Sequence, residues 1–159
     1  MENKSLIKDI ENKNIKVRYI NKQIEIDEKV KINIEKYWKT VENIFRRGKI
    51  FVIKDIKEEN ENINIDIYFS DYAHYIYTKK NSVPIYEKCK NLWSGILLET
   101  LDHKYLFGEM SNITASAGEY HISGGSCDEE EIEDGYMNFE KTMYRELKEE
   151  FNLQPAAIL

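Results

Sequence analysis

The clearest alternation of apolar and polar positions lies in residues 63–69, INIDIYF. In an extended chain Ile63, Ile65, Ile67 and Phe69 point to one face and the residues between them to the other. This pattern predicts a half-buried β-strand. Residues 15–20 and 22–27 alternate in the same way and predict short strands or a hairpin. Residues 50–56, IFVIKDI, predict another strand.

Helical spacing of apolar residues appears in two longer segments. Val30, Ile34, Trp38, Val41 and Phe45 predict a helix that Asp27 caps, that runs to about Phe45, and that Gly48 closes. Phe139, Met143, Leu147 and Phe151 recur every four residues and predict a helix over 139–151 with Asn138 as its N-cap. Residues 71–79, DYAHYIYTK, are typical of a short, aromatic-rich helix.

The character of the chain changes after Pro84. Residues 94–102 and 105–111 predict a hairpin that turns at His103-Lys104, and residues 119–123 predict a short strand that leads into Gly124-Gly125. Strands and helices are mixed without a regular alternation, which predicts an α+β fold. We divide the chain into an N-terminal α/β subdomain, residues 1–88, and a second domain, residues 89–159.

Composition and charge narrow the function. The chain has 159 residues, 42% of them hydrophobic, and a net charge of −6. An acidic chain without a concentrated basic surface is not expected to bind nucleic acid. Two cysteines are too few for a disulfide framework, and no segment has the apolar length of a signal peptide core or a membrane span. We expect a soluble, cytoplasmic protein with neither nucleic acid nor membrane as a partner.

Three carboxylates on the last predicted helix carry the candidate chemistry. Glu146, Glu149 and Glu150 are spaced i, i+3 and i+4, so their side chains converge on one helix face and repel one another. One explanation is a solvated face, compensated by Lys141, Arg145 and Lys148. The other is a hard divalent cation, because Mg²⁺ prefers carboxylate oxygens and shares substrate phosphates.

The order of features around these carboxylates resembles the Nudix hydrolase superfamily. A strand leads into Gly124-Gly125, a loop follows, and then Arg145-Glu146-Leu147-Lys148-Glu149-Glu150-Phe151-Asn152-Leu153. The family's box runs Gly, five residues, Glu, seven residues, Arg-Glu-aliphatic-x-Glu-Glu-x-Gly-aliphatic. Residues 94–111 and 119–125 look like the family's opening hairpin and its approach to the box. The resemblance implies a Nudix-like α/β/α sandwich for the second domain.

This sequence departs from the family pattern in three places. Asn152 replaces the final Gly, which is mild because Asn tolerates left-handed backbone. Ser123 stands where Pro is usual. The loop after Gly125 is too long, so that counting back eight residues from Arg145 gives Met137 instead of the first Glu. The replacements left open for that Glu, a structural residue in the family, are Glu133, Asp134 and Glu140.

The resemblance implies roles for particular residues. Glu146, Glu149 and Glu150, with the backbone carbonyl of Gly124, would bind Mg²⁺ or Mn²⁺. Glu146 or a neighbour would orient or deprotonate water, and Arg145 would clamp the carboxylates, so Glu146, Glu149 and Arg145 are the catalytic candidates. The implied reaction is hydrolysis of a nucleoside diphosphate linked to another group.

The N-terminal half suggests a narrower substrate. Residues 35–125 look similar to the region before the box in UDP-glucose pyrophosphatases of the Nudix group, which implies that a UDP-sugar gives UMP and a sugar 1-phosphate. Tyr72, Tyr75 and Tyr77 could line a base or sugar pocket or simply pack. His121, on the strand before Gly124, could reach the site or serve only in the strand.

Only six residues follow Leu153 in this sequence, whereas a Nudix domain continues with further strands and a helix. We therefore expect an incomplete sandwich whose apolar surfaces, among them Ile96, Leu98, Leu106 and Phe107, associate with a second copy as a homodimer. The alternative function is a catalytically inactive or truncated Nudix-like module that binds a nucleotide or a protein.

Overall fold

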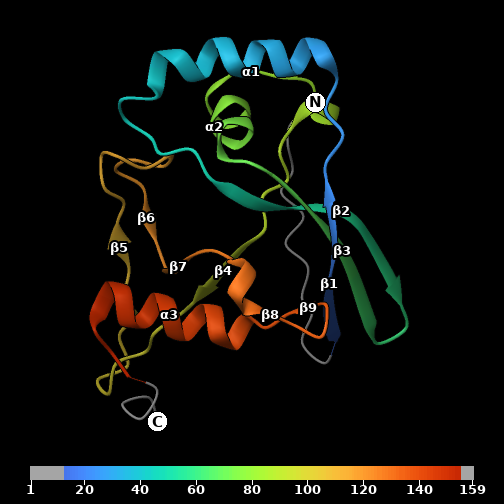
Figure 1. The fold of residues 1–159 in the computed structure, drawn as a ribbon. Helices are drawn as coiled ribbons and strands as arrows, with labels where there is room; N and C mark the ends of the chain where they lie inside the picture. The colour runs from blue at the N-terminus through green and yellow to red at the C-terminus, as the bar shows by residue number, and fades with distance from the viewer. Residues whose placement is uncertain (1–12, 155–159) are drawn as a thin grey trace.

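A computed structural model describes residues 13–154 as an α+β fold (Figure 1), which confirms the predicted fold class. Helices α1 and α2 lie at one end of the molecule and α3 at the other. The longer elements are α1 (Glu28–Val41), α2 (Tyr72–Lys80), α3 (Phe139–Phe151), β1 (Asn14–Gln23), β2 (Lys49–Glu59) and β3 (Asn62–Asp71). The shorter elements are β4 (Trp93–Ile96), β5 (Gly108–Glu109), β6 (Tyr120–His121), β7 (Ser123–Ser126), β8 (Ile132–Glu133), β9 (Tyr136–Met137) and the 3₁₀ turns Ile85–Glu87 and Glu129–Glu131.

The largest sheet has the strand order β2-β3-β1-β9-β8. Strands β2 and β3 form an antiparallel hairpin, while β1 runs parallel to β3 with Val17 opposite Ile65. Ile63 and Ile67 are buried as the alternation predicted. The hairpin predicted for residues 15–27 is wrong, because residues 14–23 form one strand whose partner is 48 residues away in sequence.

Both longer predicted helices form, with side-chain caps that satisfy free amides at their starts. Asp27 accepts a hydrogen bond from the Lys29 amide at 2.8 Å, and Asn138 accepts one from the Lys141 amide at 3.2 Å. Helix α1 ends at Val41, four residues before the predicted Phe45. Asn152 ends α3 in the left-handed conformation, with φ of 55°, so asparagine takes the conformation for which glycine is usual.

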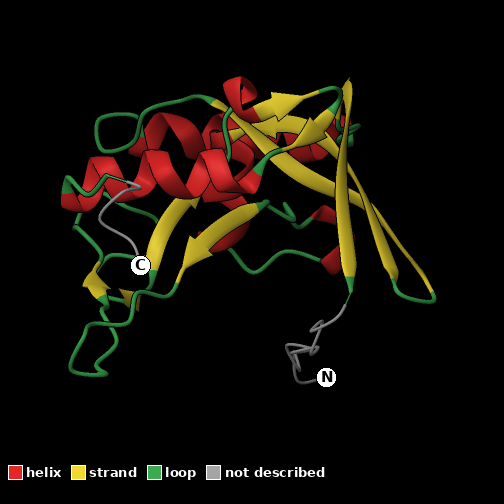
Figure 2. Cartoon of the chain, turned by 90° about the horizontal axis from the view of Figure 1, so that it is seen from below, coloured by secondary structure: helices red, strands yellow, loops and turns green. Residues whose placement is uncertain are grey.

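The second half of the chain forms two separate two-stranded sheets. Strand β4 pairs with β7, and β5 pairs with β6. The predicted hairpin between residues 94–102 and 105–111 forms only around its turn, where Glu99 bridges Tyr105, the Thr100 amide donates to the Lys104 carbonyl at 2.8 Å and the Leu106 amide donates to the Leu98 carbonyl at 3.1 Å. Figure 2 shows α3 lying over the short strands, and α3 packs against both β4 and β7.

Residues from both sides of the predicted domain boundary share one core and one sheet. Val17, Phe51 and Ile67 pack with Leu92, Cys127 and Met137. Strand β9, from the second half, pairs with β1 through Arg18 and Tyr136. The division into residues 1–88 and 89–159 stays a prediction. A second core lies between α1 and α2, with Val30, Ile34, Trp38 and Ala73 buried.

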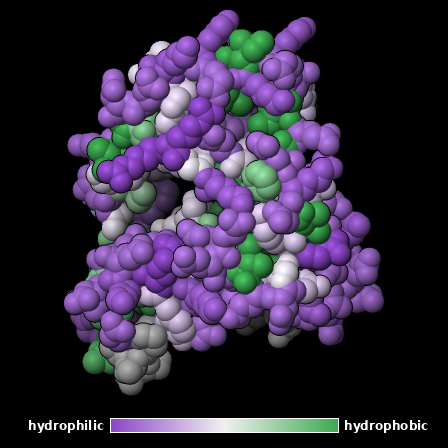
Figure 3. Space-filling model, in the orientation of Figure 1, coloured by the Kyte–Doolittle hydropathy of each residue, from purple (hydrophilic) through white to green (hydrophobic). Residues whose placement is uncertain are grey.

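The surface combines a polar face with an exposed apolar region. Figure 3 shows mostly hydrophilic side chains on one face, with a hollow between the end that contains α1 and the end that contains α3. Ile96 and Leu98 are half-buried, whereas Leu106 and Phe107 are 38% and 53% exposed. The homodimer expected from these residues stays a prediction. No helix of the described residues is long and apolar enough to cross a membrane.

Candidate functional site

The three carboxylates of α3 lie beside the glycine-containing strand β7. Glu146 is 8% exposed, whereas Glu149 and Glu150 are exposed. The Ser123 hydroxyl, on β7, donates a hydrogen bond to Glu150 Oε2 at 2.5 Å. The fold therefore brings the strand before Gly124-Gly125 and the helix with the carboxylates into direct contact, although Ser123 and Glu150 are 27 positions apart in the sequence.

Gly124 is required by how closely β7 approaches β4, and Gly125 lies against the Glu146 carboxylate. A Cβ on Gly125 would overlap the carboxylate of Glu146, so this position lets the acidic side chain lie flat against the strand. A Cβ on Gly124 would overlap the backbone oxygen of Ser94 on β4, and Gly124 has φ of 150°. The Gly-Gly pair thus fits β7 between β4 on one side and Glu146 on the other.

Arg145 is the centre of the hydrogen-bond network. Its Nη1 donates to Glu146 Oε1 at 2.8 Å and to Glu149 Oε2 at 3.3 Å, and its Nη2 donates to the Ser126 carbonyl at 3.0 Å. Its Nε donates to Glu131 Oε1 at 2.8 Å. The guanidinium therefore fixes two of the three carboxylates to one another and to the end of β7.

Glu131 is the site residue that the sequence reasoning missed. It is 4% exposed, and besides Arg145 it accepts hydrogen bonds from the Thr142 hydroxyl at 2.6 Å and the Asp128 amide at 2.8 Å. Counting forward from Gly125 finds it, because five residues separate the two, as in the Nudix box. The extra residues lie instead between Glu131 and Arg145, where 13 residues replace the seven of the box.

Glu131, and none of the three residues left open for the first Glu of the box, is the residue bonded to Arg145 among these four. Glu133 is exposed and binds Lys141 and Asn138, each through a side-chain contact of about 2.5–2.6 Å. Asp134 occupies a turn with φ of 50°, and Glu140 accepts a hydrogen bond from Tyr144 at 2.8 Å. Glu131 occupies the position beside the arginine because the 3₁₀ turn at residues 129–131 directs it inward.

The environment of Glu146 opposes its negative charge. Desolvation on burial raises its pKa, the nearby Glu150 and Glu149 raise it further, and attraction to Arg145 opposes this shift. Burial also opposes the charge of Arg145, but the hydrogen bond that Arg145 donates to Glu131 and the negative charge of Glu146 outweigh this effect, so the pKa of Arg145 is raised. A cation that bound here would relieve the repulsion among the three carboxylates.

The donor type at the site fits Mg²⁺ or Mn²⁺. All three side chains offer carboxylate oxygens, which hard divalent cations prefer. Glu146 Oε2, Glu149 Oε1 and Glu150 Oε1 accept no hydrogen bond from residues 13–154. Within the same residues, no group of three or more His, Cys, Asp or Glu side chains forms a preformed metal site. The site therefore fits these cations through the type of its donors, carboxylate oxygens on one helix face. Such a site suits a cation that keeps several of its water ligands.

The remaining sequence candidates make other contacts. The Tyr72 and Tyr75 rings lie 5.7 Å apart between centroids, and Tyr77 packs edge-on against Tyr37 of α1 at 6.0 Å. His121 contacts Glu119 at 3.0 Å on the same short strand region. Tyr77 therefore packs between α2 and α1, Tyr72 and Tyr75 pack against each other on α2, and His121 has a local partner.

No protein-family model matches this chain, and no curated protein matches it significantly. The relationship to Nudix hydrolases therefore stays a prediction, and the residues described above are what support it.

Proposed function

We propose that this chain is a hydrolase of the Nudix type, dependent on Mg²⁺ or Mn²⁺, that cleaves a nucleoside diphosphate linked to another group. The observation that carries the proposal is the network of Arg145, which joins Glu131, Glu146, Glu149 and the end of β7. A helix face that was merely solvated would not need the buried Glu131 behind its carboxylates, nor a residue without a Cβ, Gly125, against Glu146.

Each residue has a distinct part in the proposal. Glu146, Glu149 and Glu150 would hold the cation, with the Gly124 carbonyl as an additional ligand. A bound divalent cation would neutralise the diphosphate and favour attack by water. Glu146 or a neighbour would orient or deprotonate the attacking water. Arg145 holds Glu146 and Glu149 in place.

The substrate that the proposal favours is a UDP-sugar. The support is the similarity of residues 35–125 to UDP-glucose pyrophosphatases, together with the box. Hydrolysis of UDP-glucose would give UMP and glucose 1-phosphate.

A substrate panel followed by ³¹P NMR tests both the chemistry and the specificity. Nucleotide sugars, dinucleoside polyphosphates and NADH are incubated with the protein in Mg²⁺ and in excess chelator, alongside Glu149→Gln/Glu150→Gln and the control Glu130→Gln. We expect Mg²⁺-dependent release of UMP from UDP-glucose by the wild type and the control, and a loss of at least about a hundredfold in the double variant.

The outcomes separate the parts of the proposal. Preference for a substrate that is not a nucleotide sugar would refute the specificity and leave the chemistry intact. Turnover that is equal in the double variant would refute the site. Nucleotide binding without any turnover would assign the chain to the alternative, a non-catalytic binding module.

A further inference from the structure

One cavity of the described residues lies far from α3 in the chain and shares no residue with the site above. It has a volume of about 730 Å³ and is formed by the segment that enters α1, by β2, by α2 and by residues 86–90. Pockets that hold small organic molecules usually measure about 300–1,000 Å³. The cavity is thus large enough for a small organic ligand.

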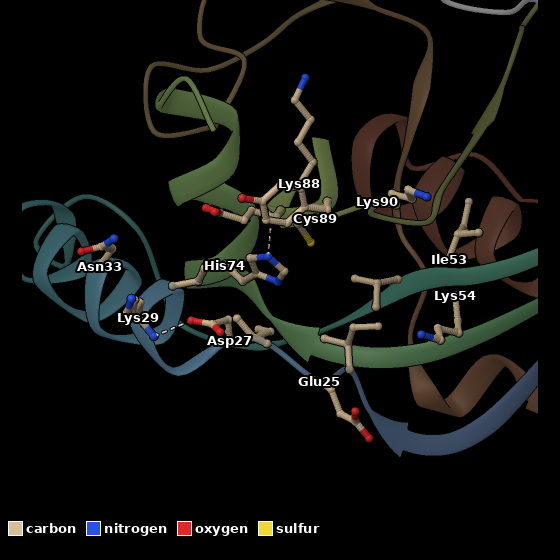
Figure 4. A pocket seen from close by; sticks show the side chains of 16 residues that line it. Glu25, Asp27, Lys29, Asn33, Ile53, Lys54, His74, Lys88, Cys89 and Lys90 are labelled. Carbon is tan, nitrogen blue, oxygen red and sulfur yellow. Dashed lines mark hydrogen bonds between the residues drawn. The ribbon is translucent and has the colours of Figure 1, made fainter. Parts of the chain in front are cut away.

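The walls of this cavity are held in place by specific bonds. Three hydrogen bonds hold residues 86–90 in place. The His74 ring bonds the Glu87 carbonyl at 3.0 Å, the Cys89 amide donates to the Thr78 hydroxyl at 3.2 Å, and the Ile53 amide donates to the Lys90 carbonyl at 2.8 Å. On the opposite side, Asp27 caps α1. Figure 4 shows His74 between these two walls.

The lining of the cavity combines apolar side chains with polar and charged ones. Ile24, Ile26, Val30, Val52 and Ile53 contribute to it. His74 is 5% exposed, and desolvation lowers its pKa, so that the ring is neutral at pH 7. Both of its ring nitrogens are engaged, one with Ser70 and the other with the Glu87 carbonyl. An apolar part of a ligand could therefore pack against His74 without leaving a ring nitrogen unpaired.

The charges at the cavity belong mainly to four exposed lysines: Lys29, Lys54, Lys88 and Lys90. None of them forms an ion pair with a carboxylate of residues 13–154, although the chain as a whole is acidic. Three carboxylates also line the cavity. These are Glu25, which pairs with Lys22 at 3.5 Å, Asp27, which accepts the Lys29 amide, and Glu87, so the lining carries one more positive than negative side chain.

We infer that this cavity binds a small organic anion with an apolar body. The apolar side chains of the lining would take the body, and the exposed ammonium groups would take the anionic group near the opening. The unpaired lysines would favour an anion over a neutral or cationic molecule of the same shape. The site is independent of the proposed hydrolase activity, and its failure would leave that proposal unchanged.

Three naphthalene derivatives with a common ring test the inference: naphthalene-1-sulfonate, 1-naphthalenemethanol and 1-naphthylmethylammonium. Binding to the full chain is measured by calorimetry and located by the methyl NMR signals of isoleucine and valine. We expect the sulfonate to bind about tenfold or more tightly than the other two and to shift the signals of Ile24, Ile26, Val30, Val52 and Ile53.

Two variants of equal net charge give the matched comparison. Lys29→Gln/Lys54→Gln/Lys88→Gln/Lys90→Gln should weaken sulfonate binding about tenfold and leave binding of the alcohol unchanged. Lys16→Gln/Lys36→Gln/Lys39→Gln/Lys80→Gln, which alters unpaired lysines elsewhere, should bind the sulfonate as the wild type does. Equal affinity for the three compounds, shifts confined to other methyl groups, or equal losses in both variants would each overturn the inference, and so would absence of binding. The comparison of the three compounds on the wild type decides the matter even where a variant does not fold.

Discussion

Replacing Glu131 with alanine should destabilise the chain by about 3 kcal/mol, because it removes one acceptor from three donors at once. Glu131 is 4% exposed and accepts hydrogen bonds from Arg145, Thr142 and Asp128. The fully buried Thr142 hydroxyl would lose its carboxylate acceptor, which alone costs about 1–3 kcal/mol.

The part of this destabilisation that comes from breaking the Glu131–Arg145 ion pair is at the low end of the range for breaking a buried ion pair. Its side chain is 33% exposed, so solvent compensates part of the loss, and it retains Glu146, Glu149 and the Ser126 carbonyl. Glu131→Gln keeps the shape and one acceptor oxygen but puts an amide group against one donor. We expect it to cost about half as much as Glu131→Ala.

Urea unfolding followed by circular dichroism measures these differences from the midpoint and the m-value. Glu130→Ala is the matched control, because Glu130 lies in the same acidic turn and is exposed. Its effect should stay within about 0.5 kcal/mol. If Glu131→Ala unfolds at the same urea concentration as Glu130→Ala, the reasoning that makes Glu131 the anchor of Arg145 is refuted.

Three further predictions follow from particular contacts. Gly124→Ala should lower the free energy of unfolding by about 2–4 kcal/mol, because its Cβ would overlap the Ser94 oxygen, whereas Gly48→Ala, with open space around it, should change it by less than about 0.5 kcal/mol in the same urea assay. Since desolvation lowers the pKa of His74, the folded state binds fewer protons than the unfolded state, and its contribution to stability is complete above about pH 6.5 and is lost as pH falls towards the lowered pKa. Unfolding free energies of the wild type and His74→Asn between pH 5 and 7 check this, and parallel pH profiles would contradict it. Burial raises the pKa of Cys89 to about 12, so its reaction with a thiol reagent at pH 8 should be about a hundredfold or more slower in the folded chain than in urea, and equal rates would contradict the burial.

Local patterns predicted much of the fold. The period of the apolar residues found α1, α3 and β3, and the side chains of Asp27 and Asn138 marked where the two helices begin. These features depend on neighbouring residues, so the sequence carries them directly. The parallel pairing of β1 with β3 was not predictable in this way, because it depends on contacts between segments far apart in the chain.

The part of the candidate site that depends on local spacing could be predicted from the sequence. The spacing of Glu146, Glu149 and Glu150 placed them on one helix face, and in the structure Glu146 and Glu150 contact β7. Counting backwards from Arg145 does not reach Glu131, because the loop between the two residues is unusually long. The forward count from Gly125 would have found it, since the strand and the 3₁₀ turn that follows it keep their spacing.

Titration with Mn²⁺, followed by water proton relaxation, tests the central claim most directly, because it measures the cation site without requiring turnover. The wild type is compared with Glu149→Gln/Glu150→Gln and with Glu130→Gln/Glu140→Gln, which removes the same charge from residues outside the proposed metal ligands. The account predicts that the wild type and the second variant bind Mn²⁺ with the same Kd and that the first variant binds it at least about tenfold more weakly. Equal binding by all three proteins, or no binding by the wild type, would contradict it.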